Sequence, residues 1–311
     1  MLRDGQNQGG TAEALPPLRR EGVCFVGGGV VSQLVIGMIG AGHMADALIK
    51  GLLGRHVLLP DAIWATNRSS RERLAALQAR YSIRGTPTKP ALLAAANVLI
   101  LAVKPKDTQQ LLAELDGAVR ADQLTISVIA GIPLAVLEAK LSGVPLIRAM
   151  PNTSAAVLAS ATALTAGPHA TDEHMRTATR IFDAVGDTVL VPEDVLDVVT
   201  GLSGSGPAYV YRLIEAMIHG GTELGLTGDL ARRLAVQTLI GAARMLAESR
   251  EDPAELRRRV TSPGGTTMAA LGVLEDRGFG LAVRDAISRA AERAREMARE
   301  FGGRDGQDAE R

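Results

Sequence analysis

The sequence predicts an α/β N-terminal domain with a doubly wound parallel sheet, followed by an all-helical domain. Short uncharged apolar runs alternate with helix-like segments between residues 34 and 192, which is typical of strands buried on both faces of a parallel sheet. A glycine-rich turn joins the first run to the first helix, and strand-like runs end at Pro192. With 311 residues, the chain is long enough for two hydrophobic cores.

Composition narrows the classes of partner. The 34 Lys and Arg residues balance the 34 Asp and Glu residues, which argues against nucleic acid as the main partner. Cys24 is the single cysteine, so no disulfide can form within the chain. A reducing compartment, the cytoplasm, is therefore expected.

Residues 1–33 precede the first predicted strand and are expected to be a disordered extension, or the result of a start codon placed too early. Arg19 and Arg20 stand before an uncharged run over residues 23–42, as in a twin-arginine signal. Three glycines at 27–29 interrupt that run, so it makes a poor membrane-spanning helix. Its second half also forms the first strand and turn, and a soluble protein without a membrane partner is predicted.

The first strand and the turn after it predict a dinucleotide site. Residues 34–39 form an apolar strand that runs into the turn sequence Gly40, Ala41, Gly42, His43, Met44 and Ala45. In this strand-turn-helix context Gly40 permits the tight turn, Gly42 lets a pyrophosphate approach the backbone, and Ala45 allows close packing. Residues 34–192 are therefore expected to form a Rossmann-type domain that binds NAD(P).

The residues after the second strand, 62–66, bear on the choice of cofactor. Sites that prefer NAD place an acidic residue here for the ribose 2′-hydroxyl. This chain has Asn67, Arg68 and Ser69, whose amide, guanidinium and hydroxyl groups suit a 2′-phosphate. NADPH is the predicted cofactor, with NADH also possible; the alternative is a solvated turn without a role in cofactor choice.

The rest of the chain completes the sheet and then turns helical. Five further apolar runs lie at residues 98–103, 124–129, 146–147, 161–164 and 188–191. After Pro192 helical spacing covers residues 208–224, 230–246 and about 281–301, and Asp252, Pro253 and Glu255 have the spacing of a capping box. Residues 193–311 are expected to form an all-helical domain that binds substrate. Because it is apolar and has no strands, part of its surface should be buried in another subunit.

The stretch from Thr261 to Thr267 reads Thr-Ser-Pro-Gly-Gly-Thr-Thr. The proline and the two glycines interrupt any helix, and apolar helical spacing resumes at Met268. A tight loop that feeds a helix N-terminus is predicted, and its free backbone N–H groups suit a carboxylate or a phosphate. The alternative is an ordinary helix start that a threonine caps.

Four segments together resemble pyrroline-5-carboxylate reductase, the enzyme family of the last step of proline biosynthesis. They are residues 40–44, 102–105, 200–209 and 261–267, and the resemblance runs from about residue 35 to about residue 297. It implies reduction of 1-pyrroline-5-carboxylate to L-proline by NAD(P)H, with hydride added to the C=N carbon and no obligatory metal. It also implies a homodimer or larger homo-oligomer, in which the nucleotide domain of one subunit and the helices of another form each site.

The resemblance assigns site residues by position. The substrate carboxylate is expected on Ser262, Gly264, Gly265 and Thr266, and the Thr267 hydroxyl is the catalytic group expected at the imine nitrogen. Glu193 matches a glutamate near that nitrogen; its alternative is an exposed linker carboxylate. The cofactor is expected to contact Ile39, Gly40, Ala41, Gly42, His43, Met44, Asn67, Arg68, Ser69, Ala102, Val103, Lys104, Pro105 and Ala130.

Some residues leave alternatives or depart from the family pattern. Lys104 could be read as a catalytic base, but hydride addition to an imine needs no lysine nucleophile, so a positioning or solvated role is favoured. Lys89 and Arg259 stand where many relatives carry asparagine, and both add positive charge near the expected cofactor.

Two other classes of protein compete with this interpretation. A β-hydroxyacid dehydrogenase shares the order of domains but uses a helical-domain lysine, and residues 195–311 contain no lysine. A redox-sensing protein that only binds a nicotinamide cofactor would explain the glycine turn and leave the loop at 261–267 unexplained.

Overall fold

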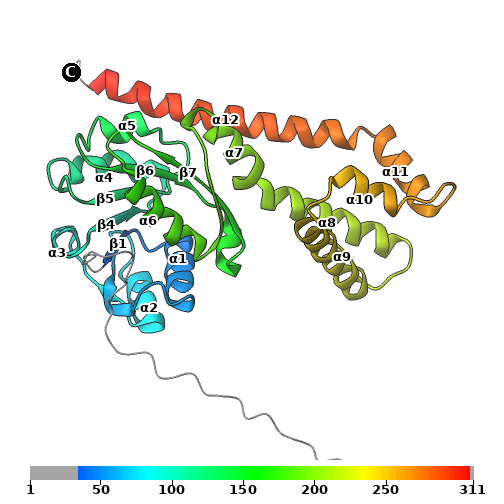
Figure 1. The fold of residues 1–311 in the computed structure, drawn as a ribbon, viewed down its shortest axis with the longest axis horizontal. Coiled ribbons are helices and arrows are strands. Elements are labelled where there is room, and N and C mark those ends of the chain that lie inside the picture. Colours follow the sequence, from blue (N-terminus) through cyan, green and yellow to red (C-terminus); the bar gives the residue numbers. More distant parts are fainter. Residues whose placement is uncertain (1–33, 309–311) are drawn as a thin grey trace, which may run out of the picture. The chain divides into compact units, whose positions relative to one another are not determined.

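The computed structural model describes residues 34–308, with side chains as far as Phe301. The predicted extension at residues 1–33 lies outside the described residues. Eight strands form one sheet in the order β3-β2-β1-β4-β5-β6-β7-β8, and helices lie on both of its faces (Figure 1).

Seven of these strands are the apolar runs that the sequence predicts. They are β1 (Ile36–Ile39), β2 (Ile63–Thr66), β4 (Val98–Leu101), β5 (Leu124–Ser127), β6 (Leu146–Met150), β7 (Ser160–Ala166) and β8 (Gly186–Leu190). The eighth, β3 (Arg84–Gly85), has only two residues and no apolar run, so nothing in the sequence pattern marks it. Its two residues count as a strand because they pair with Trp64 and Ala65 of β2.

The order of pairing makes the sheet doubly wound. β1 lies between β2 and β4 and is parallel to both, so the chain winds first to one side of β1 and then to the other. Ligands of such sheets bind where the order reverses, beyond the carboxyl ends of the strands. In this chain that place is the end of β1 at Ile39.

The prediction of a parallel sheet holds for β1 to β6 and needs one correction. β7 pairs antiparallel with β6. The connection at residues 151–159 contains only the short 3₁₀ helix η3 (Thr153–Val157), and a parallel crossover needs a dozen or more residues. β8 then runs parallel to β7, because α6 (Asp172–Asp183) supplies a full crossover between them.

Alternate side chains along each strand point to opposite faces of the sheet and pack in two hydrophobic cores, one on each face. On the first face, residues such as Met38 and Ile100 pack with α1 (His43–Gly54), α2 (Arg71–Tyr81) and α6. On the second face, residues such as Leu99 and Leu101 pack with α3 (Lys89–Ala95), α4 (Thr108–Leu115) and α5 (Leu134–Glu138). Burial on both faces explains why the central strands β1, β4 and β5 are uncharged.

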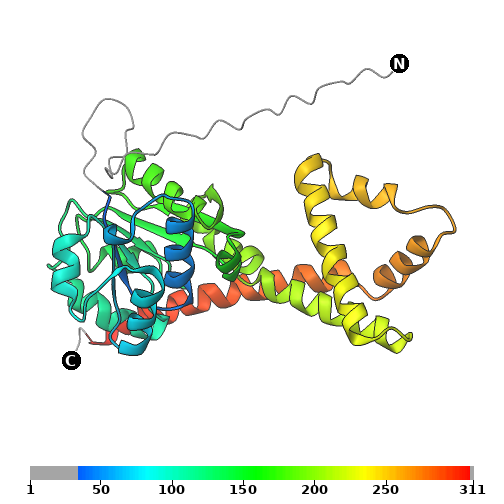
Figure 2. The ribbon, with the colours of Figure 1, turned by 90° about the horizontal axis from the view of Figure 1, so that it is seen from below.

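From Leu196 on, the described elements are helices. They are α7 (Leu196–Val199), the π-helical turn η5 (Thr200–Gly204), α8 (Gly206–Glu223), α9 (Gly228–Ser249), α10 (Pro253–Arg259), α11 (Thr266–Asp276) and α12 (Phe279–Asp308). α8 packs on α9, and α12 runs along α7 and η5, as both views show (Figures 1 and 2). A Cβ on Gly201 would lie 2.6 Å from the Ile287 carbonyl oxygen, so the backbones of η5 and α12 meet at this glycine.

The predicted capping box before α10 does not form, although Asp252 caps the helix. The Asp252 carboxylate accepts a hydrogen bond from the Ala254 N–H at 2.7 Å. The Glu255 carboxylate accepts from Arg258 and Arg259 and does not reach back to Asp252. The local ion pairs compete with the second half of the motif.

The helical part buries little of its own apolar surface. Between residues 193 and 301, the buried apolar residues are Leu196 and four alanines. Large apolar side chains are exposed along the helices, among them Val210, Tyr211, Leu224, Leu234, Met245, Val273 and Leu281. An apolar surface of this extent is typical of one that another protein surface covers. Within residues 34–308 no helix has the length and hydropathy to cross a membrane.

Candidate active site

The glycine turn brings the end of β1 against the end of β4. Gly40 has φ +116°, its N–H donates to the Thr66 carbonyl at 2.9 Å, and a Cβ on it would overlap the carbonyl oxygen of Ala102. The Ala102 N–H in turn donates to the Ile39 carbonyl at 2.9 Å. Only glycine fits this backbone conformation and this space.

Helix α1 then begins without a side-chain cap. Gly42 is its N-cap residue and has no side chain to accept from the first helical amides, which leaves those N–H groups for another acceptor. Free amides at the positive end of a helix suit a pyrophosphate. The exposed His43 ring lies 3.2 Å from the Arg73 guanidinium, and Ala41 and Ala45 are buried. The residues present therefore fit the diphosphate of a dinucleotide.

A cavity of about 110 Å³ lies beside this turn. Its lining includes Ile39, Gly40, Thr66, Asn67, Arg68, Ser69, Pro87, Lys89, Val103, Asp107, Leu111 and Glu114. Six of the predicted cofactor residues thus come together here. The Asn67 amide donates to the Ser70 carbonyl and accepts from the Ser69 hydroxyl, so Asn67 fixes the turn and leaves the Arg68 side chain projecting, 52% exposed.

Sequence reasoning missed the acidic half of this cavity. The Arg68 guanidinium lies 3.6 Å from the Asp107 carboxylate and 3.9 Å from that of Glu114. Lys89 donates a short hydrogen bond to Glu114, which lowers the pKa of the Glu114 carboxyl. Asp107 and Glu114 are seven residues apart at the start and on the body of α4, a spacing that places them on one helix face. That spacing is the signal that could have revealed them.

The remaining predicted cofactor residues lie at the ends of β4 and β5. Ala102 and Val103 are half-buried, and Pro105 opens η2 (Pro105–Asp107). Lys104 is exposed and makes no ion pair with any residue in 34–301, which agrees with a solvated side chain. Ala130 precedes Gly131, whose φ is +74°.

The loop from Thr261 to Thr267 folds as a tight turn before α11. Gly264 has φ +70°, and the Gly265 N–H donates to the Ser262 carbonyl at 3.0 Å. The N-cap residue is Gly265, without a side-chain hydrogen bond, so the alternative of a threonine cap is wrong. A Cβ on Gly265 would overlap the Ser262 Oγ, which places that hydroxyl beside the open helix N-terminus. Ser262, Gly264 and Thr266 are exposed, and Thr267 is half-buried.

Glu193 belongs to an ion network around the buried Arg148 side chain. Its Oε1 accepts from the Leu134 N–H and from Arg148 Nη1, both at 2.9 Å. Arg148 Nη2 lies 3.8 Å from Asp197 Oδ1. The network ties β6 and α5 to the start of α7, so the alternative of an exposed linker carboxylate is wrong. None of its hydrogen bonds involves the loop before α11.

The two groups of predicted residues are not joined within one chain. None of the hydrogen bonds or ion pairs of residues 34–301 connects the loop before α11 with the glycine turn. In the packing of the helices, α11 lies on α12.

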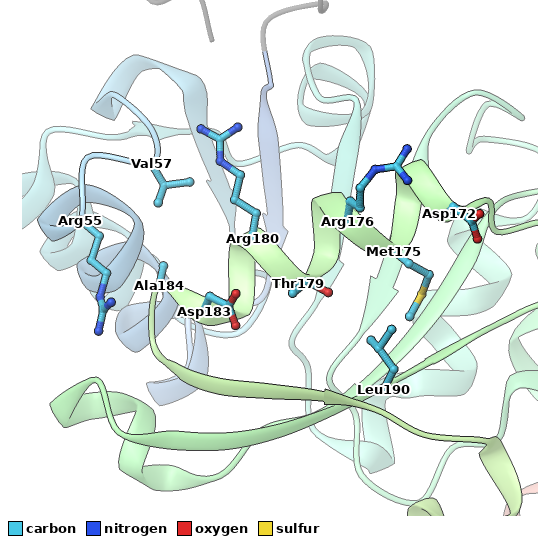
Figure 3. Close-up of a pocket in the computed structure, with 10 residues that line it drawn as sticks. All are labelled: Arg55, Val57, Asp172, Met175, Arg176, Thr179, Arg180, Asp183, Ala184 and Leu190. Carbon is cyan, nitrogen blue, oxygen red and sulfur yellow. The ribbon is translucent and has the colours of Figure 1, made fainter. Parts of the chain in front are cut away.

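A hollow larger than the cavity beside the glycine turn contains none of the predicted site residues. Its volume is about 700 Å³, and α6, the end of α1 and the end of β8 form it (Figure 3). Arg55, Arg176 and Arg180 line it with Asp172 and Asp183. The volume of a hollow therefore does not identify the site in this fold.

Comparison with known proteins assigns the two parts of the chain. A family model described as pyrroline-5-carboxylate reductase dimerisation matches residues 193–297. One described as NADP oxidoreductase, coenzyme F420-dependent, matches residues 35–131.

Whole-chain relatives agree. Pyrroline-5-carboxylate reductase 1 of Bacillus spizizenii is 40% identical over 269 residues, which cover 86% of this chain and 91% of the relative. The pyrroline-5-carboxylate reductase of Methanosarcina acetivorans is 41% identical and covers 84% of this chain and 97% of its own length.

Solved structures match the fold over the same range. The pyrroline-5-carboxylate reductase of Coxiella burnetii has a TM-score of 0.81 at 35% identity, with 86% of this chain and 99% of the other covered. The Plasmodium falciparum pyrroline carboxylate reductase with NADP bound has a TM-score of 0.77 at 26% identity, with 85% and 98% covered. Since relatives about 40% identical match along nearly their whole length, this chain belongs to the pyrroline-5-carboxylate reductase family.

Proposed function

We propose that this chain reduces 1-pyrroline-5-carboxylate to L-proline with NAD(P)H. The observation that carries the proposal is the presence, in a member of this family, of two helices that follow a glycine turn and begin at a glycine N-cap: one at Gly42 and one at Gly265. The first suits the diphosphate of the cofactor, and the second suits the carboxylate of the substrate.

The substrate is a small cyclic imine that carries a carboxylate. Its carboxylate needs hydrogen-bond donors that are fixed before it arrives. Ser262, Gly264, Gly265 and Thr266 are the proposed set. The first amides of α11 have no side-chain cap and start beside the Ser262 hydroxyl. The Gly265 N–H already donates to the Ser262 carbonyl, so Gly265 contributes the space that its missing side chain leaves. The positive end of the helix adds attraction for the anion.

Thr267 is the second residue of α11 and the proposed catalytic group. A carboxylate bound at the helix start puts the imine within reach of the first helical turn, where the Thr267 hydroxyl polarises the nitrogen. Threonine is a weak acid, so water, or an iminium that is already protonated, supplies the proton. A bound nicotinamide supplies the hydride for the C=N carbon.

The proposed working unit is a homodimer or larger homo-oligomer in the cytoplasm. The exposed apolar faces of α8, α9 and α11 and the match to a dimerisation model support it. Each site would then join the glycine turn of one subunit to the loop before α11 of another. The cytoplasmic location rests on the single cysteine.

The deciding experiment is an assay of NADPH oxidation with pyrroline-5-carboxylate by the purified chain. Thr267→Val removes the hydroxyl at nearly constant shape and should lower kcat/KM by about 10- to 100-fold. Thr267→Ser keeps the hydroxyl and should stay within about threefold of wild type. No substrate-dependent turnover by folded wild type would refute the function, and equal kinetics of the Val variant would remove Thr267 from the mechanism.

A further inference from the structure

Four charged side chains beside the glycine turn neutralise one another. Arg68 and Lys89 supply two positive charges, and Asp107 and Glu114 supply two negative charges. All four line the cavity that also contains Gly40 and the turn after β2. Arg68, which is predicted to receive a 2′-phosphate, and Lys89, which adds positive charge beside it, therefore already have partners within the chain.

Glu114 is the centre of this group. Its Oε2 accepts from Lys89, its Oε1 accepts from Gln110 at 3.1 Å, and the Arg68 guanidinium approaches to 3.9 Å. The Asp107 carboxylate pairs with Arg68, at 3.6 Å. The Lys89 side chain is 22% exposed, against 52% for Arg68, so the Lys89–Glu114 pair is the better shielded of the contacts.

A 2′-phosphate must compete with this carboxylate. It carries a charge of about −1.5 to −2 at neutral pH and prefers the same nitrogen donors. If Lys89 and Arg68 turn to the phosphate, Glu114 loses its partners and lies next to a like charge. A 2′-hydroxyl is uncharged and does not compete with Glu114 for Lys89 and Arg68, so the ion pairs among the four side chains stay intact.

We propose that Glu114 sets the cofactor preference of this reductase: it holds Lys89 and Arg68 in competition with the 2′-phosphate, and so brings the affinities for NADPH and NADH closer together. The inference rests on the proposed function for the identity of the cofactor. Lys89 is the matching specificity residue, because it alone contacts Glu114 with a hydrogen bond from a charged group.

The test measures binding without chemistry. The probes are adenosine 2′,5′-bisphosphate and AMP, which differ only in the 2′-phosphate, titrated by calorimetry into the full chain. Glu114→Gln should lower the Kd of the bisphosphate about tenfold and leave the Kd of AMP within about twofold. Lys89→Gln should raise the Kd of the bisphosphate, and adding Glu114→Gln to it should then have less effect than in wild type.

The control is Asp122→Asn, which removes one negative charge from an exposed pair with Arg120 outside the cavity lining. It should change neither Kd. Glu114 is itself more than a third exposed in its side chain, so Glu114→Gln should lower the thermal midpoint only slightly and leave the chain folded during the titration. The proposal fails if Glu114→Gln leaves the Kd of the bisphosphate unchanged, or if both probes change by the same factor. Both outcomes are independent of whether pyrroline-5-carboxylate is the substrate.

Discussion

Replacing Arg148 tests whether the buried ion network holds the fold together. In Arg148→Met, a side chain that is 5% exposed loses its charge, and the carboxylates of Glu193 and Asp197 lose their shared partner. Removing one member of a buried ion pair costs about 3–5 kcal/mol. Glu193 is about one-third exposed and keeps its hydrogen bond from Leu134, so we expect a loss of about 2–4 kcal/mol in the free energy of unfolding.

The assay is urea denaturation followed by circular dichroism, at one protein concentration because association changes apparent stability. The thermal midpoint should fall by about 5–15 °C. Arg80→Met is the matched control: it removes the same charge from an exposed pair with Asp46, which should cost under about 1 kcal/mol.

A second substitution separates charge from packing. Asp197→Asn added to Arg148→Met removes one of the stranded charges and should recover part of the lost stability, because the uncompensated carboxylate causes the loss. Equal losses for Arg148→Met and Arg80→Met, or no recovery in the double variant, would refute the reasoning.

Three further outcomes follow from single contacts. Gly40→Ala should destabilise the fold by about 2–4 kcal/mol and abolish NADPH binding, because the positive φ of Gly40 and its neighbours exclude a Cβ. The control is Gly54→Ala, whose Cβ would meet nothing within 4 Å, so stability and NADPH binding should stay unchanged. Equal thermal midpoints of the two variants would contradict this reasoning. Asp252→Ala should lower the stability of α10 by about 0.5–2 kcal/mol, because the helix loses its N-cap hydrogen bond. Amide hydrogen exchange in the first turn of α10 should become faster, and unchanged exchange would count against the cap. Hydrogen bonding from Lys89 lowers the pKa of Glu114 from 4.5, so the contribution of the Glu114 carboxylate to folding stability is present above pH 4.5 and is lost as the pH falls through the lowered pKa. The urea midpoint of wild type should therefore exceed that of Glu114→Gln near neutral pH and approach it in acid. A difference that does not change with pH would exclude this titration.

The sequence by itself was enough to predict the central strands and the two glycine turns. The strands at the sheet centre are uncharged because both of their faces are buried, and that requirement leaves apolar runs that can be recognised one by one. The turn at Gly40 and the turn at Gly264 each need a glycine for a positive φ, and each turn leads into a helix whose N-cap residue is itself a glycine. The family resemblance rests on these same local segments.

Long-range pairing was decided only by the tertiary structure. The direction of β7 depends on the length of the connection before it, and β3 exists only because β2 lies beside it. The sequence left Glu193 either as a residue near the substrate nitrogen or as an exposed linker carboxylate, and its ion pair with Arg148 of β6 depends on the tertiary structure. Glu114 and Lys89 come from different helices, and their pairing depends on how α3 and α4 pack on the sheet. Whether two opposite charges neutralise each other depends on the distance between them in space, whereas the sequence by itself gives only their separation along the chain.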